Sequence, residues 1–185
     1  LGLSLVLAVD THIHADHVTA LGTLRERTDC ATAMGEMTRT ECVSVHFRDG
    51  ERLDIDGLEL RALYTPGHTN DSYSFLMPDR VFTGDTLLIR GTGRTDFQNG
   101  DAAEQYDSLF GQLLTLPEHT LVYPAHDYNG MTVSTIGEEL RHNPRLQVAN
   151  KAEYVALMDK LDLADPRLMD VAVPANRSCG LRPAA

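Results

Sequence analysis

The stretch that decides the fold of this chain is Val9-Asp10-Thr11-His12-Ile13-His14-Ala15-Asp16-His17. Its first residue, Val9, is the last residue of an apolar run over residues 3–9. Its last six residues carry three imidazoles and a carboxylate. These nitrogen and oxygen donors suit zinc, iron and manganese, whereas a thiolate site would need cysteines that the stretch lacks. A buried strand that leads directly into a metal-binding loop is therefore predicted.

Three further ligand-type side chains each stand in a turn just after a strand-like run: His68, Asp85 and His126. Junctions between strands and loops are where a rigid scaffold presents functional groups. Gly67 and Gly84 are expected to permit tight turns that swing the side chains after them inward. Together with the first motif, these residues predict a metal-dependent enzyme. The remaining histidines fit surface or core positions and are His46, His119 and His142.

The composition bounds the architecture and the partners. At 185 residues the chain suits one domain with a proper core, so a single domain over residues 1–185 is predicted. An apolar fraction of 42% and a charged fraction of 23% are typical of a soluble globular protein. The net charge of −11 opposes nucleic-acid binding, because phosphate recognition rests on Lys and Arg. No apolar run approaches the ~20 residues of a membrane span, so no membrane partner is expected.

The three cysteines, Cys30, Cys42 and Cys179, are odd in number and widely spaced. This pattern favours neither a disulfide framework nor a C-x-x-C metal site. It predicts a reducing compartment, either bacterial cytoplasm or the mitochondrial matrix of a eukaryote. No targeting segment is visible, because residues 1–9 lack the basic start and the cleavage site of a signal peptide.

Hairpins mixed with helices are predicted along the chain. Asp56-Gly57 and Pro78-Asp79 are turn signals between strand-like runs. Asp101, with Glu104 three residues on, predicts the start of a helix. The expected strands cover residues 3–9, 52–55, 58–64, 72–77, 80–83 and 121–123, and the expected helices cover 17–27, 101–114, 133–141 and 150–161. This order suits a layered α/β sandwich whose loops present the ligands at one edge of the sheets.

The pattern H-x-H-x-D-H, then G-H, then G-D, then a final His resembles the metallo-β-lactamase superfamily over nearly the whole chain. Residues 91–101, here called the glycine-rich loop, are similar to the hallmark loop of the persulfide dioxygenases, also named sulfur dioxygenases. Residues 123–130, 143–145 and 173–176 are similar to the same family. The resemblance implies a metallo-β-lactamase-like αββα sandwich. That fold normally begins with strands before the first motif, so an N-terminally truncated domain with an unpaired sheet edge is expected.

The resemblance also implies roles for single residues. One Fe(II) per chain would be held by His12, His68 and Asp85, the 2-His-1-carboxylate set of non-haem iron oxygenases. Other residues would either support these ligands by hydrogen bonds or mark a vestigial position for a second metal. They are His14, Asp16, His17 and His126, with Thr83 and Asp127 as supports of the ligand-bearing turns.

The implied reaction joins glutathione persulfide and O2 to give sulfite and glutathione, as in sulfide catabolism. Arg94 would hold a glutathione carboxylate, because its planar guanidinium can donate two parallel hydrogen bonds. A structural ion pair of Arg94 with Asp96 or Asp101 is the alternative. Tyr128 would contact the substrate through its phenol. A homodimer is a further expectation from the resemblance.

The sequence is also compatible with two other hypotheses about function. The first is a glyoxalase II-like thioester hydrolase with a dinuclear site, in which case zinc is the expected metal. All of its candidate ligands are present here, but the run Arg94-Thr95-Asp96-Phe97 continues the glycine-rich loop differently. The second is an inactive fragment or binding module, motivated by the missing N-terminal strands.

Overall fold

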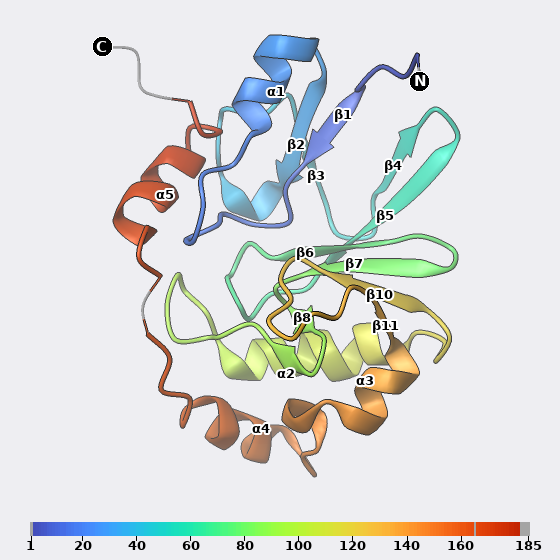
Figure 1. Ribbon diagram of the computed structural model, residues 1–185, viewed down its shortest axis with the longest axis vertical. Helices are drawn as coiled ribbons and strands as arrows, with labels where there is room; N and C mark the ends of the chain where they lie inside the picture. The colour runs from blue at the N-terminus through green and yellow to red at the C-terminus, as the bar shows by residue number, and fades with distance from the viewer. Residues whose placement is uncertain (1, 165, 182–185) are drawn as a thin grey trace.

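The computed structural model describes residues 2–164 and 166–181. Two sheets face each other, with helices on both outer sides (Figure 1). The first sheet joins β1 (Leu7–Val9), β2 (Ala31–Gly35) and β3 (Val45–Phe47) in parallel. The second has the strand order β11-β10-β7-β6-β5-β4. The layered α/β sandwich predicted from the sequence is confirmed.

The remaining elements follow in chain order. The other strands are β4 (Arg52–Ile55), β5 (Leu58–Tyr64), β6 (Tyr73–Leu76), β7 (Arg80–Gly84), β8 (Leu87–Leu88), β9 (Gly91–Thr92), β10 (Leu121–Pro124) and β11 (Ser134–Thr135). The helices are α1 (Leu21–Thr28), α2 (Ala102–Gly111), α3 (Ile136–His142), α4 (Lys151–Met158) and α5 (Met169–Asn176). Helices α1 and α5 flank the three-stranded sheet, and α2, α3 and α4 lie beyond the six-stranded one (Figure 1).

The middle of the six-stranded sheet is buried on both faces. Neighbouring residues of a strand point to opposite faces, and β5 shows the consequence. Ala62 packs with Phe47 and Tyr73 in the core between the sheets. Leu63 packs with Leu109 and other residues in the core under the helices. Two layers of buried side chains therefore fix the sheet whose ends carry the site.

Both predicted hairpins form. Strands β4 and β5 pair in the expected register around Asp56 and Gly57, whose φ angles are 53° and 86°. Two consecutive positive φ angles define the hairpin turn that the Asp-Gly pair predicts. The Asp54 carboxylate accepts a 2.9 Å hydrogen bond from the Gly57 N–H. Asp101 also caps α2, accepting hydrogen bonds from the N–H groups of residues 103 and 104.

Several element boundaries differ from the prediction. The strand expected over residues 3–9 begins at Leu7, because its neighbour β2 begins at Ala31, which pairs with Leu7. The helix expected from residue 17 begins at Leu21, since the preceding backbone belongs to the metal-binding loop. The helices predicted to end at residues 114 and 161 end at Gly111 and Met158. Helix α3 begins at Ile136, where the Thr135 hydroxyl caps it.

Helix α5 and strands β2 and β3 were not predicted, nor were the two-residue strands β8, β9 and β11. Helix α5 contains Pro174, which has no backbone N–H and normally argues against a helix interior. The prediction that the cysteines form no disulfide is wrong for one pair. Cys42 and Cys179 form a disulfide across 137 residues, while Cys30 is free and buried. This pairing depends on where α5 packs, and it removes the support for a reducing compartment.

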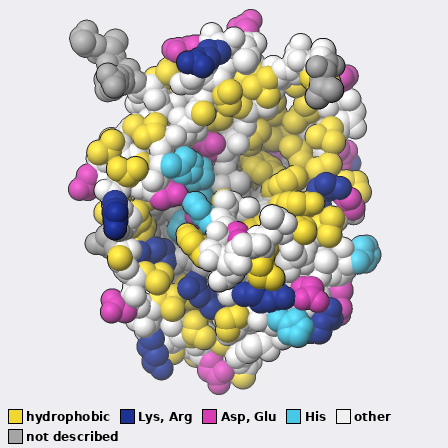
Figure 2. Space-filling model, viewed as in Figure 1, with side chains coloured by type: hydrophobic (Ala, Val, Ile, Leu, Met, Phe, Trp, Pro, Cys, Tyr) yellow, Lys and Arg dark blue, Asp and Glu magenta, His cyan; other side chains and the backbone are white. Residues whose placement is uncertain are grey.

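Strand β1 is an edge strand in the described part of the chain, where β2 is its one neighbour in the sheet order. Exposed apolar side chains precede it, with Leu3 85% and Val6 53% accessible. Hydrophobic side chains gather over the same upper part of the molecule in Figure 2. Within residues 2–164 and 166–181, every helix is too short or too polar to cross a membrane.

Candidate metal centre

Strand direction gathers the ligand-type residues at one edge of the six-stranded sheet. Strand β6 is antiparallel to both β5 and β7, and β10 is parallel to β7, so β5, β7 and β10 run the same way. His68, Asp85 and His126 follow these strands and emerge at one edge, where His12 meets them from the end of β1. His68, Asp85 and His126 border a cavity of about 520 Å³, and Figure 2 shows histidine and acidic side chains at a hollow.

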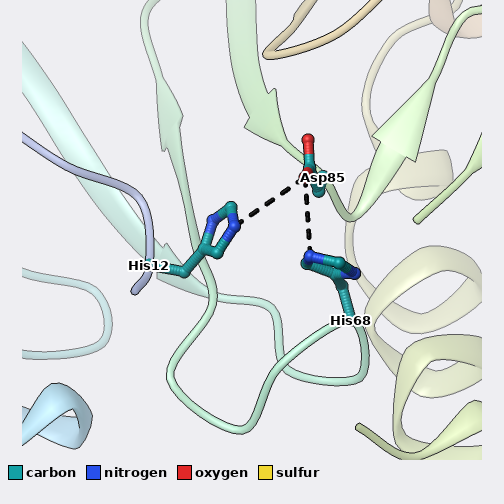
Figure 3. Close-up of side chains that lie close together, drawn as sticks. All are labelled: His12, His68 and Asp85. Atoms are coloured by element: carbon teal, nitrogen blue, oxygen red, sulfur yellow. Dashed lines mark ion pairs between the residues drawn. The ribbon is translucent and has the colours of Figure 1, made fainter. Parts of the chain in front are cut away.

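Asp85 is the centre of the cluster. Its Oδ2 lies 3.8 Å from His12 Nε2, 3.4 Å from His68 Nε2 and 3.6 Å from His126 Nε2. Figure 3 shows His12 and His68 directed toward Asp85 from separate loops. One donor atom from each of His12, His68 and Asp85 lies within 4.8 Å of the others. The structure thus brings together the three residues predicted as ligands.

Glycines shape the turns that present two of these groups. Gly67 has φ 132° and Gly84 has φ 51°, both of which L-residues rarely adopt. A Cβ on Gly67 would lie 2.3 Å from Gln105 Cα, so the turn before His68 also packs tightly on α2. The Thr83 hydroxyl donates a 2.6 Å hydrogen bond to the Leu87 carbonyl and closes the turn that bears Asp85. The expected tight turns at Gly67 and Gly84 are confirmed, and the role of Thr83 as a support of a metal ligand stays a prediction.

Neighbouring groups orient the two imidazoles. His68 Nδ1 donates a 2.8 Å hydrogen bond to the Arg94 carbonyl, which leaves the Nε2 lone pair facing Asp85. His12 Nδ1 is 2.9 Å from the Thr11 hydroxyl, so its Nε2 faces Asp85 as well. A histidine that ligates a metal through one nitrogen usually uses the other in this way.

Burial keeps the imidazoles of His12 and His14 neutral. It lowers the pKa of His12 well below the ordinary value of 6.5, and the nearby imidazoles of His14 and His68 lower it further. Burial likewise lowers the pKa of His14 to about 4. Burial raises the pKa of Asp85, because a carboxylate without a nearby cation is costly there. Neutral imidazoles beside a desolvated carboxylate are the state that a divalent cation requires of its ligands.

A buried oxygen atom without a hydrogen-bond partner is a second indication that the site binds a metal. Asp85 Oδ1 is buried and has no hydrogen-bond partner among residues 2–164 and 166–181. An unpaired buried carboxylate oxygen is costly, and a cation at this point would satisfy it. Two imidazole nitrogens and a carboxylate are also the donor types of non-haem iron sites. The residues present therefore fit the metal that the pattern implies.

A second group lies beside the first. His14, Asp16 and His17 also bring one donor atom each within 4.8 Å of one another. Asp16 Oδ1 is 3.1 Å from His17 Nδ1, and Asp16 Oδ2 is 3.3 Å from His126 Nε2. His126 thus stands between Asp16 and Asp85. Buried His14 Nδ1 has no hydrogen-bond partner in the described part of the chain, while Asp16 and His17 are exposed.

The glycine-rich loop serves the site mainly through its backbone. Besides the Arg94 carbonyl, its Gly93 N–H donates a 2.7 Å hydrogen bond to the Asp85 carbonyl. Gln98 Nε2 donates to the Ile13 carbonyl at 2.9 Å. The loop therefore contacts each of the three segments that carry His12, His68 and Asp85, which gives its sequence a structural reason.

The Arg94 side chain forms the structural ion pair that the sequence analysis gave as the alternative to substrate binding. Its Nε and Nη2 donate to the two oxygens of Asp96, both at 2.6 Å, and its Nη1 donates to the Ala164 carbonyl at 2.7 Å. The guanidinium also stacks 4.1 Å from the Phe97 ring centroid. The ion pair is with Asp96 and lies at the cavity wall. The substrate contact predicted for Arg94 stays a prediction.

Two further predicted residues lie on the loop after β10. Tyr128 is 78% exposed, lines the cavity, and stacks on His126 with ring centroids 5.9 Å apart. The Asp127 carboxylate accepts hydrogen bonds from the N–H groups of Asn129 and Met131, at 3.2 and 2.6 Å. Asp127 thus shapes the loop that carries Tyr128, and its support of the metal ligands stays a prediction.

Arg145 is a cavity residue to which the sequence analysis assigned no role. It lines the cavity, and its Nη1 donates to the Thr92 carbonyl at 2.5 Å. No carboxylate within residues 2–164 and 166–181 forms an ion pair with it. The Asn143-Pro144-Arg145 segment was noted only as a family match. A half-buried cation at a cavity wall is visible only once α3 and the loop after it are placed.

The fold and the metal-type site define a protein of the metallo-β-lactamase superfamily, and the model of that superfamily matches residues 43–126. "Persulfide dioxygenase ETHE1, mitochondrial" of Bos taurus is 45% identical over 98% of this chain and 72% of its own length. The Homo sapiens protein of that name is 44% identical with the same coverage. The crystal structure of ETHE1 from Myxococcus xanthus superposes with a TM-score of 0.94, at 52% identity over 97% of this chain and 80% of that one. The chain belongs to the persulfide dioxygenase family.

Proposed function

We propose that this chain is an iron-dependent persulfide dioxygenase, which oxidises glutathione persulfide with O2 to sulfite and glutathione. The observation that carries the proposal is the convergence of His12, His68 and Asp85 on one point, in a chain 45% identical to a named persulfide dioxygenase. Two imidazoles and one carboxylate leave coordination positions for two further molecules, which a sulfur substrate and dioxygen require. When bound, Fe(II) supplies the redox chemistry and the positions at which both reactants are held.

The residues of the chain would hold and orient the reactants. His12, His68 and Asp85 would hold the metal, with the ring tautomers set by Thr11 and the Arg94 carbonyl. Apolar walls would limit water at the reacting sulfur; they come from Leu88, Ile89, Phe97 and Leu163.

The glutathione part of the substrate would meet the polar rim of the same cavity. Arg145 offers a guanidinium for a carboxylate of the tripeptide, as proposed for Arg94 from the sequence. Tyr128 offers an exposed phenol beside His126. Because Arg94 is already bound to Asp96, Arg145 is the stronger candidate for direct substrate contact.

His14, Asp16, His17 and His126 would support the site without a second metal. Asp16 holds His17 and His126 in place by the contacts at 3.1 and 3.3 Å. Metal analysis after anaerobic loading should give one iron per chain. Two metals per chain would favour the thioester hydrolase, with zinc as its metal.

The test is oxygen uptake by the Fe(II)-loaded chain on addition of glutathione persulfide, with sulfite assayed in parallel. Uptake matched by sulfite, and abolished in His12→Ala and Asp85→Ala but not in His119→Ala, would support the proposal. A folded, iron-loaded sample without uptake would overturn it, and S-lactoylglutathione hydrolysis with zinc would then be measured. The homodimer, the single domain and the cytoplasmic or mitochondrial location stay predictions.

A further inference from the structure

Asn176, the last residue of α5, joins the C-terminal part of the chain to the metal-binding loop. It is 1% exposed, although the loop lies about 160 residues away in sequence. Its Nδ2 donates to the carbonyls of His14 and His17, both at 2.8 Å. Its Oδ1 accepts a hydrogen bond from the Thr19 N–H at 2.8 Å. One amide group therefore uses its donors and its acceptor on the backbone of residues 14–19.

The loop depends on such contacts because it has no regular secondary structure between β1 and α1. On its other side, the Asp71 carboxylate accepts from the Ile13 N–H at 3.0 Å, and Gln98 donates to the Ile13 carbonyl. Residues 14–19 are held by the hydrogen bonds of the Asn176 side chain to their backbone. His14, Asp16 and His17 lie within this span, and His12 lies two residues before it. A change in the path of residues 14–19 would therefore move these side chains.

The disulfide holds Asn176 in place. Cys179 follows Asn176 by three residues in a turn closed by N–H groups of residues 178, 179 and 180, which donate to carbonyls of Ala175 and Asn176. The Cys179 carbonyl accepts a 2.9 Å hydrogen bond from the Gly22 N–H, which fixes the turn on α1. The disulfide partner, Cys42, has its carbonyl bonded by the Arg25 guanidinium. The covalent bond therefore ties the turn after α5 to the loop that leads into β3.

We propose that Asn176 is a positioning residue for the metal ligands, and that the Cys42–Cys179 disulfide keeps it on the metal-binding loop, so that reduction loosens the metal site. The inference rests on the metal site of the proposed function and not on its sulfur chemistry. The disulfide links the turn after α5 covalently to the loop before β3. Its loss therefore frees the segment that carries the Asn176 amide.

The reductant is a low-molecular-weight thiol. Its thiolate attacks the sulfur of Cys42, which is half-buried, whereas Cys179 is fully buried. A bond forms between the thiol sulfur and Cys42 Sγ, and Cys179 leaves as a thiolate that takes up a proton. A second thiol releases Cys42 and forms the low-molecular-weight disulfide, so two thiols supply the two electrons.

The experiment is a titration of the apo chain with Co(II), followed by its visible absorption, which reports ligand geometry as well as affinity. We expect Asn176→Ala to raise the Co(II) dissociation constant about 10- to 100-fold, the usual effect of losing a group that orients ligands. Asn176→Asp keeps an acceptor for the Thr19 N–H but loses both donors, so it should bind Co(II) as weakly as Asn176→Ala. The absorption band should shift in both variants.

The matched control is Ala172→Gly, a buried change in α5 that weakens the helix and leaves the amide intact. It should lower the melting temperature without shifting the Co(II) spectrum. Cys42→Ser, and wild type reduced with glutathione and desalted, should bind Co(II) more weakly than the oxidised chain, in the direction of Asn176→Ala. Cys30→Ala, which keeps the disulfide, should not.

Unchanged Co(II) affinity and spectrum in folded Asn176→Ala would overturn the positioning role. An equal loss in Ala172→Gly would overturn it too, since general destabilisation would then explain the effect. If Asn176→Ala does not fold, Cys42→Ser decides, and identical Co(II) binding by Cys42→Ser and by the oxidised wild-type chain would overturn the proposal. Normal Co(II) binding without persulfide-dependent oxygen uptake would refute the proposed function and leave this inference intact.

Discussion

His68 donates its Nδ1–H to the backbone carbonyl of Arg94 at 2.8 Å, while the Arg94 side chain turns away to pair with Asp96. The same residue therefore orients a metal ligand through its main chain and holds the glycine-rich loop through its guanidinium. A change of the Arg94 side chain should disturb the metal site indirectly, by loosening the loop that supplies the carbonyl.

Arg94→Lys tests this relationship. A lysine ammonium cannot make the two parallel hydrogen bonds to Asp96. Asp96 is 53% exposed in its side chain, so solvent screens the pair and the expected loss is about 1 kcal/mol, or about 2–4 °C in melting temperature. Iron content after dialysis should fall together with the melting temperature. A higher KM for glutathione persulfide at unchanged melting temperature would instead favour the substrate role.

Arg145→Met removes the cavity cation proposed to bind a glutathione carboxylate. A hydrogen bond to a charged group contributes about 1.5–3 kcal/mol, so KM should rise roughly 10- to 100-fold with little change in kcat. Steady-state oxygen uptake over a range of persulfide concentrations measures both constants. Arg141→Met is the matched control, because Arg141 pairs with Glu118 on the surface. Equal KM values for the two variants would exclude Arg145 from substrate binding.

The stability of the apo chain should depend on pH through His14. Burial lowers the pKa of His14 from 6.5 to about 4. Between these pH values His14 is therefore protonated in the unfolded chain and neutral in the folded chain. Stability contributed by this group is thus present above pH 6.5 and is lost as the pH falls toward 4. The full effect is about 3 kcal/mol. Urea unfolding from pH 7 to pH 4 should show a steeper loss in wild type than in His14→Gln, and parallel curves would contradict the assignment.

The disulfide should stabilise the chain as well as the site. A crosslink that closes 137 residues restricts the unfolded chain, and bonds of this kind contribute about 2–5 kcal/mol. Cys42→Ser with Cys179→Ser should therefore melt about 10 °C lower than the oxidised wild type. One cooperative transition is expected in each, as for a single domain. Equal melting temperatures before and after reduction of wild type would refute this role of the bond.

Much of the site could be predicted because its signals are local. His12, His68 and Asp85 each follow a strand-like run, and the residue types alone define the donor chemistry. The hairpin around Asp56 and Gly57 formed as predicted, since the φ angles of a two-residue turn depend on the residues in it. Helix α5 was missed for the complementary reason: its packing overrides the local signal of Pro174.

The sequence by itself determined the order of the ligand-type residues, the sandwich class and the turns, because each depends on neighbours a few positions apart. Only the tertiary structure decided that Asp85 Oδ2 meets three imidazoles, that Arg94 pairs with Asp96 and not Asp101, and that Arg145 lines the cavity. It also decided that Cys42 meets Cys179 and that Asn176 bonds a loop 162 residues before it. Such contacts join segments whose approach is set by the packing of whole layers, and no local pattern encodes it.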